Sequence, residues 1–147
     1  MKKVWASVTG LLVITLVGCS TQGSTAAYRD IEIALGNARE SARVDCPTQA
    51  DCERFWQRTE IYVTQRSATP IRRSDDSKIE TAEPHTFGAV YVWATRTTGG
   101  GVSTIQIRAM CRGMYRADGA PGLLYRTCAE QIRAVETDFR AFIGASS

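Results

Sequence analysis

The chain has 147 residues, with 18 Lys or Arg against 15 Asp or Glu and a formal net charge of +3. So small a basic excess does not indicate electrostatic steering to nucleic acid, and no nucleic-acid partner is expected. The length suits a single domain with one modest core.

The first eighteen residues have the three-part order of a secretory signal. Lys2 and Lys3 precede an apolar stretch at residues 4–17, and Gly18 then precedes Cys19. The stretch is shorter than the roughly 20 residues that a membrane-spanning helix needs, and no charged stop-transfer cluster follows it. We therefore expect residues 1–18 to be removed during export.

The end of this leader, Leu16-Val17-Gly18-Cys19, resembles the lipobox of bacterial lipoproteins. The resemblance implies that Cys19 becomes the mature N-terminus and carries a diacylglycerol and an N-acyl chain such as palmitate. Two or three acyl chains anchor a protein stably, whereas one chain binds only reversibly. By resemblance to enteric lipoprotein sorting, Ser20 favours the outer membrane, with the domain facing the periplasm. The alternative is an ordinary secreted protein whose Cys19 belongs to the leader.

Four further cysteines follow, at positions 46, 52, 111 and 128. An even number in an exported protein predicts two disulfides, although three pairings are open. We favour Cys46 with Cys52, which closes a short loop, and Cys111 with Cys128, which flank the last loop. A metal site is not expected, because neither spacing is C-x-x-C and His85 is the only histidine.

Apolar spacing predicts three helices. Residues 19–25 are expected to form a lipidated tether, and a helix is expected to start near Ser24 or Thr25 and to run to residue 44. A second helix is expected after the Cys46 loop, with its buried face at Cys52, Phe55, Trp56, Thr59, Tyr62 and Val63. The last helix is expected to begin at a capping box, Thr127 to Glu130, and to bury Ile132, Val135, Phe139, Phe142 and Ile143.

Alternating polar and apolar residues predict the strands. Residues 71–73 and 78–81 are weak candidates on either side of a turn at 75–77, whereas residues 88–97 and 102–111 are strong ones. Gly99, Gly100 and Gly101 between the strong strands predict a hairpin, with either Gly99-Gly100 as a two-residue loop or residues 98–101 as a four-residue loop. Residues 26–147 are therefore expected to form one disulfide-braced α+β domain, an antiparallel sheet of three to four strands with helices packed on one face.

The expected hairpin register puts the apolar residues of the two strands opposite each other: Ala94 with Ile105, Val92 with Ile107, and Val90 with Ala109. On its other face it sets Trp93 opposite Gln106 and Tyr91 opposite Arg108. We interpret Tyr91, Trp93 and Arg108 either as part of a second buried layer, which we favour for two such large rings, or as a candidate docking face.

Other candidate sites have simpler interpretations. His85 lies in a turn-like segment without a nucleophile or acid at a recognisable spacing. The three glycines are not followed by a lysine, as a phosphate-binding loop requires. An enzyme is not expected unless a pocket gathers several of Asp75, Asp76, Glu80, Glu83 and His85.

One further stretch resembles a group of small, uncharacterised proteobacterial lipoproteins. It runs over about sixty residues from Asp51-Cys52 through Trp56, Tyr62-Val63, Ile79-Glu80-Thr81 and Gly99-Gly100-Gly101 to Cys111. The resemblance implies a shared domain without an activity, and the longer loop between Cys111 and Cys128 departs from the group.

The sequence therefore favours a non-enzymatic envelope lipoprotein that acts as a binding or scaffold module near the membrane. It is expected to have no cofactor beyond the lipid on Cys19, to contact the membrane through that lipid, and to bind an envelope protein partner. The alternative is an immunity or inhibitor lipoprotein that blocks a toxin or hydrolase in the periplasm.

Overall fold

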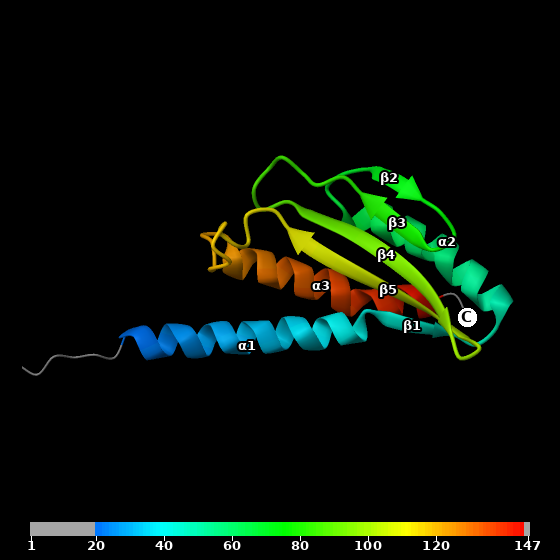
Figure 1. Ribbon diagram of the computed structural model, residues 1–147, viewed down its shortest axis with the longest axis horizontal. Coiled ribbons are helices and arrows are strands. Elements are labelled where there is room, and N and C mark those ends of the chain that lie inside the picture. Colours follow the sequence, from blue (N-terminus) through cyan, green and yellow to red (C-terminus); the bar gives the residue numbers. More distant parts are fainter. Residues whose placement is uncertain (1–19, 146–147) are drawn as a thin grey trace, which may run out of the picture.

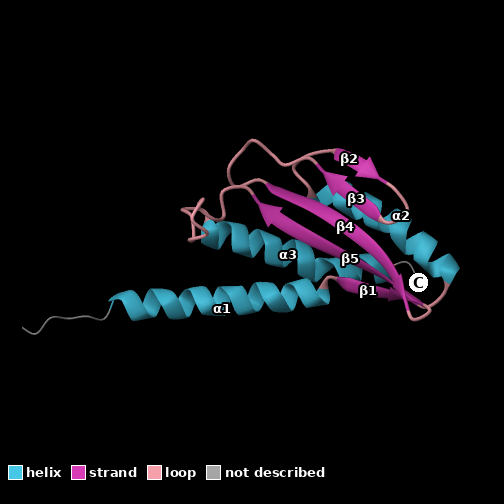
Figure 2. Ribbon diagram, in the orientation of Figure 1, coloured by secondary structure: helices cyan, strands magenta, loops and turns pink. Residues whose placement is uncertain are grey.

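A computed structural model describes residues 20–145, which form three helices and a five-stranded antiparallel sheet. Figures 1 and 2 show how these elements are arranged. The elements are α1 (Ser20–Ser41), β1 (Arg43–Cys46), α2 (Gln49–Arg66), β2 (Ile71–Ser74), β3 (Lys78–Thr81), β4 (Val90–Gly99), β5 (Val102–Cys111) and α3 (Tyr125–Gly144). The strands are ordered β1-β5-β4-β3-β2. The predicted α+β class with an antiparallel sheet is thus confirmed.

The core lies between the sheet and the helices α2 and α3. Alternate residues of β4 and β5 are buried on this side. So are most of the predicted apolar residues of the two helices, among them Tyr62, Val63, Phe139 and Ile143, whereas Phe55 and Phe142 are only partly buried. The Tyr62 hydroxyl donates a hydrogen bond to the backbone oxygen of Val135 at 2.7 Å, which joins α2 to α3. Both helices therefore cover the same face of the sheet.

One strand, β1, was not predicted. Residues 43–46 were divided between the end of the first helix and the following loop, but α1 ends at Ser41 and these residues pair with β5, with Val44 opposite Ile105. Four residues are too few for an alternating pattern to stand out. The strand forms because a distant partner supplies its hydrogen bonds, which the local sequence does not reveal.

The predicted hairpin register is wrong by two residues. Ala94 lies opposite Ile107 and Val92 opposite Ala109, so that Trp93 faces Arg108 and Tyr91 faces Met110. The turn consists of Gly100 and Gly101, which both have positive φ, and Gly99 remains in β4 opposite Val102. A two-residue turn with positive φ at both positions matches the twist of the strands. A shift of two keeps every side chain on its predicted face.

The last helix also begins earlier than predicted. It starts at Tyr125 after Leu124, and Thr127 lies inside its first turn, so the capping box does not form. The chain enters the helix through a turn instead, in which the Tyr125 N–H donates to the Gly122 oxygen at 3.2 Å.

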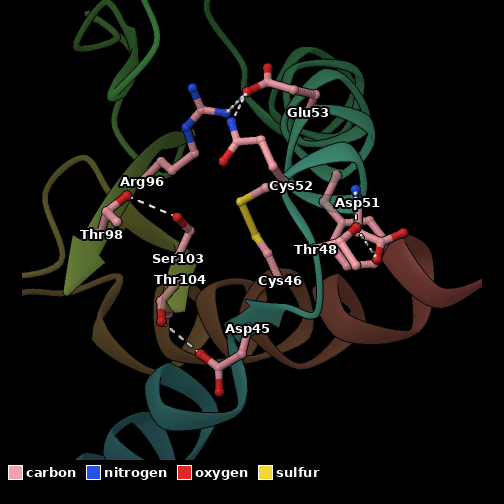
Figure 3. Close-up of a disulfide and its surroundings, with 12 residues drawn as sticks. Asp45, Cys46, Thr48, Asp51, Cys52, Glu53, Arg96, Thr98, Ser103 and Thr104 are labelled. Carbon is pink, nitrogen blue, oxygen red and sulfur yellow. Dashed lines mark hydrogen bonds and ion pairs between the residues drawn. A yellow bond between two sulfur atoms is a disulfide. The ribbon is translucent and has the colours of Figure 1, made fainter. Parts of the chain in front are cut away.

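Both predicted disulfides are present, Cys46 with Cys52 and Cys111 with Cys128. The first joins the end of β1 to the first turn of α2, beside an ion pair of 3.0 Å between Arg96 on β4 and Glu53 on α2 (Figure 3). The second joins the end of β5 to the first turn of α3. The bonds therefore fasten the two covering helices to the sheet.

Helix α1 packs against α3, and its first turns extend past the sheet in Figure 1. It begins at Ser20, so residues 20–25, predicted as a tether, are helical. Cys19 lies outside the described residues.

A buried carboxylate joins α3 to the edge of β5 beyond the end of β1. Glu136 on α3 is fully buried, and one of its oxygens, Oε1, accepts a hydrogen bond from the Ala109 backbone N–H at 3.0 Å. Arg39 Nε on α1 lies 3.9 Å from the same oxygen. Burial raises the pKa of Glu136, and the Ala109 hydrogen bond and Arg39 oppose this rise. This group therefore links α1, α3 and β5.

Candidate functional site

The face of the sheet opposite α2 and α3 is the candidate site, and within residues 20–145 it is not covered by a helix. Tyr91 and Trp93 of β4 project from this face and are half-buried, and Arg108 of β5 beside them is exposed. The favoured prediction of a second buried layer is therefore wrong for the described residues. We call the residues around these two rings the open face.

The two rings form the centre of the open face. Their centroids lie 6.1 Å apart, close enough for contact between the rings. In the strand order Trp93 lies between Glu80 of β3 and Arg108 of β5, so a carboxylate and a guanidinium flank the indole in the adjacent strands.

A shallow groove of about 500 Å³ runs along the rings toward β2. It is lined by Arg72, Lys78, Glu80, Thr81, Glu83, Tyr91 and Trp93. The β2 and β3 strands supply its charged wall because Lys78 and Glu80 alternate with the buried Ile79 and Thr81. The groove therefore combines an aromatic floor with charges of both signs.

Three of the four charged side chains that line the groove form ion pairs. Lys78 Nζ lies 2.5 Å from Glu80 Oε1, and the hydrogen bond from Lys78 lowers the pKa of Glu80. Arg112 forms an ion pair with Glu83. Burial raises the pKa of Tyr91, and the charge of Glu83 raises it further, so the phenol stays neutral at physiological pH. The groove thus presents two ion pairs, the Arg72 guanidinium and neutral rings.

The structure gathers only part of the predicted acidic cluster. Of the five candidates, Glu80 and Glu83 line the groove, whereas Asp75, Asp76 and His85 do not. The Asp75 carboxylate orders the β2–β3 turn by accepting hydrogen bonds from the backbone N–H groups of Ser77 and Lys78, both at 2.9 Å. These bonds, with the Ser77 hydroxyl and Arg73, hold its pKa well below the usual range.

The sequence analysis missed the contribution of β2 and β3 to the site. Alternation in residues 78–81 was a usable signal, since it separates Lys78 and Glu80 from Ile79 and Thr81. What the pattern did not show is that β3 pairs with β4, with Glu80 opposite Trp93. That pairing brings the charged side chains beside the rings.

Two further findings concern ligands and membranes. Within residues 20–145, three or more His, Cys, Asp or Glu side chains do not come together as a metal-binding group. A helix long and apolar enough to cross a membrane is likewise not found in this part of the chain.

Comparisons with protein-family models, with curated proteins and with solved structures find no match to this chain. The site is therefore interpreted from its own geometry.

Proposed function

We propose that this chain is a lipid-anchored protein of the bacterial envelope that binds a protein partner through the open face. The observation that carries the proposal is the pair of half-buried rings, Tyr91 and Trp93, on a sheet face that the described helices leave uncovered. Large rings at a partly hydrated surface become fully buried only when another molecule covers them.

The composition of the open face fits a protein partner. Aromatic residues and arginine are enriched in protein interfaces, and a few such side chains at the centre dominate the binding energy. Here two rings lie beside Arg108, and paired charges surround them. These paired charges surround the rings as a rim, and a partner of mixed charge suits such a rim better than a uniformly charged polymer does.

The proposal assigns no catalytic role. The two carboxylates of the groove, Glu80 and Glu83, are engaged by Lys78 and Arg112, so they serve the rim as ion-paired groups. In a binding module, such pairs select partners by charge complementarity more than they add affinity.

The anchor is proposed at Cys19, from the lipobox resemblance, and the outer membrane from Ser20. Cys19 directly precedes Ser20, the first residue of α1. A helix joined directly to the lipid would restrict the domain to the vicinity of its membrane, so the partner is expected in the envelope.

We expect Trp93→Ala to weaken partner binding strongly while the domain stays folded. Since the ring is half-buried, its loss should lower the free energy of unfolding by only about 1–2 kcal/mol. Removal of a central aromatic side chain should weaken the complex more than about tenfold. The measurement is photocrosslinking in intact cells from a crosslinker at Arg108, with and without Trp93→Ala, together with urea unfolding.

The matched control is the exposed Ile61 of α2, on the helical side of the molecule. Ile61→Ala should leave the crosslinked product unchanged, and a crosslinker at Ile61 should not give it. Equal products from Arg108 and Ile61, or an unchanged product with Trp93→Ala, would refute the open face as the docking site.

A further inference from the structure

Two loops meet at one end of the domain, where β4 begins and β5 ends. The Gly88 N–H donates to the Arg112 oxygen at 2.8 Å, and the Arg112 N–H donates to the Ala89 oxygen at 3.0 Å. The Phe87 ring lies so close over Gly113 that a Cβ there would be 2.1 Å from its Cδ1 atom. We call residues 82–89 and 112–124 together the loop end.

The loop end exposes two large apolar side chains. Phe87 is 68% exposed and Leu123 is fully exposed, the two highest values among the large apolar residues that the structure describes as exposed. The backbone around Leu123 is fixed by hydrogen bonds, with the Gly122 N–H donating to the Met114 oxygen at 2.8 Å. Exposed apolar side chains that gather at one end of a domain mark a candidate contact surface.

The N-terminal half of α1 lies beside this same end. The Tyr28 and Tyr125 rings are 5.0 Å apart, those of Tyr115 and Tyr125 are 5.7 Å apart, and the Tyr115 hydroxyl donates to Glu32 Oε1 at 2.8 Å. Tyr28 is eight residues after Ser20, the first residue of α1, which corresponds to about 12 Å along the helix axis. The start of α1, which directly follows the proposed lipid site at Cys19, therefore lies at the same end of the domain as the loop end and reaches past it (Figure 1).

We propose that the loop end lies on the membrane that holds Cys19, with Phe87 and Leu123 in the interface between lipid and water. This inference rests on the lipid anchor of the proposed function. The half-exposed Tyr28 and Tyr115 fit the same place, since a ring with one polar end suits a boundary that is apolar on one side and wet on the other.

The contact is apolar in character. Arg112 and Arg116 of the loop end form ion pairs with Glu83 and Asp118, so their charges are already balanced within the domain. Attraction to anionic lipid therefore contributes little, and the contact should depend only weakly on salt. With this end on the membrane, β4 and β5 extend away from the surface, and the turn at Gly100 and Gly101 is the distal end of the domain (Figure 1).

The test uses the full lipidated protein in vesicles whose phospholipids carry bromine on the upper acyl chain. Three single variants, Phe87→Trp, Leu123→Trp and Val102→Trp, each add one indole to Trp56 and Trp93, whose fluorescence is subtracted with the parent protein. Val102 is the matched control, because it is 49% exposed and lies beside the distal turn. The expected result is severalfold stronger quenching at positions 87 and 123 than at position 102, unchanged in high salt.

Equal quenching at all three positions would overturn the inference. The inference would also be overturned if the fluorescence of the indoles at 87 and 123 changed only on addition of an envelope protein fraction. The loop end would then contact a protein instead of the membrane. The mass of Cys19 is measured on the same samples. Absence of lipid there contradicts the proposed anchor, whereas a lipidated protein without selective quenching contradicts only the placement of the loop end. Phe87 and Leu123 are exposed, so the substitutions should not unfold the domain, and either position alone decides the outcome.

Discussion

Replacement of Glu136 with Ala is expected to lower the free energy of unfolding by about 3 kcal/mol. The substitution leaves the buried Ala109 N–H without its acceptor and leaves a cavity where the fully buried side chain was, and both effects are destabilising. Urea unfolding at neutral pH measures this loss. Because Glu136 joins α1, α3 and β5, the variant should also loosen α1, which hydrogen exchange would detect.

Glu136→Gln is the matched control, because it keeps an acceptor for Ala109 but removes the charge. We expect it to be close to the parent protein in stability. Burial raises the pKa of Glu136 above its usual value of 4.5, so the folded state binds the proton more tightly than the unfolded state. The contribution of this carboxyl is thus full below pH 4.5 and is lost as the pH rises through the raised pKa.

The free energy of unfolding of the parent protein, minus that of Glu136→Gln, should therefore decrease as the pH rises from 4.5 through the raised pKa of Glu136. A Gln variant as unstable as the Ala variant, or parallel pH profiles for the parent and the Gln variant, would contradict this account.

Removal of the Cys111–Cys128 disulfide by a double Ala substitution is expected to lower the free energy of unfolding by about 3 kcal/mol on the chain-entropy account, since the bond closes a loop with a sequence separation of 17. The bond joins the end of β5 to α3 next to the loop end, so the segment from 113 to 124 should become more sensitive to protease. Thermal and urea unfolding measure the first effect, and limited proteolysis measures the second.

The Cys46–Cys52 bond supplies the control, because its sequence separation is only 6. Its double Ala variant should lose about 2 kcal/mol and leave the loop from 113 to 124 protected. A larger loss for this shorter loop would show that packing of the buried sulfurs, rather than loop closure, determines the effect.

Local patterns were sufficient to predict the helices and strands whose buried residues recur at a regular spacing along the chain. The apolar spacing of α2 and α3 located their buried faces, and alternation in β4 and β5 assigned each side chain to the correct face. The register failed because alternation is unchanged by a shift of two, and three consecutive glycines allow more than one turn. Only the conformations of Gly100 and Gly101 select the observed pairing.

Features that depend on distant contacts were missed. Strand β1 exists through its pairing with β5, and the start of α3 depends on the turn at Gly122. Glu136 was not singled out, although it lies four residues after Ile132 and three before Phe139, on the buried face of the helix. A carboxylate within an apolar stripe was a signal that sequence reasoning had available.

The candidate site was predictable only in part, because its residues follow a local pattern whereas its exposure depends on distant contacts. Tyr91, Trp93 and Arg108 were placed on one face by alternation, but whether that face is covered depends on where the three helices pack. Because α1 packs against α3, it does not form a second layer over Trp93. The sequence shows that α1 has an apolar stripe, but it does not show which element of the fold this stripe packs against.

The central claim, a lipid-anchored module, is tested most directly by the intact mass of the mature protein extracted from membranes. The expected N-terminus is Cys19 carrying a diacylglycerol and an acyl chain, and Cys19→Ser should abolish this modification and release the domain from the membrane fraction. A mature protein with an unmodified Cys19, or one that begins elsewhere, would contradict the account.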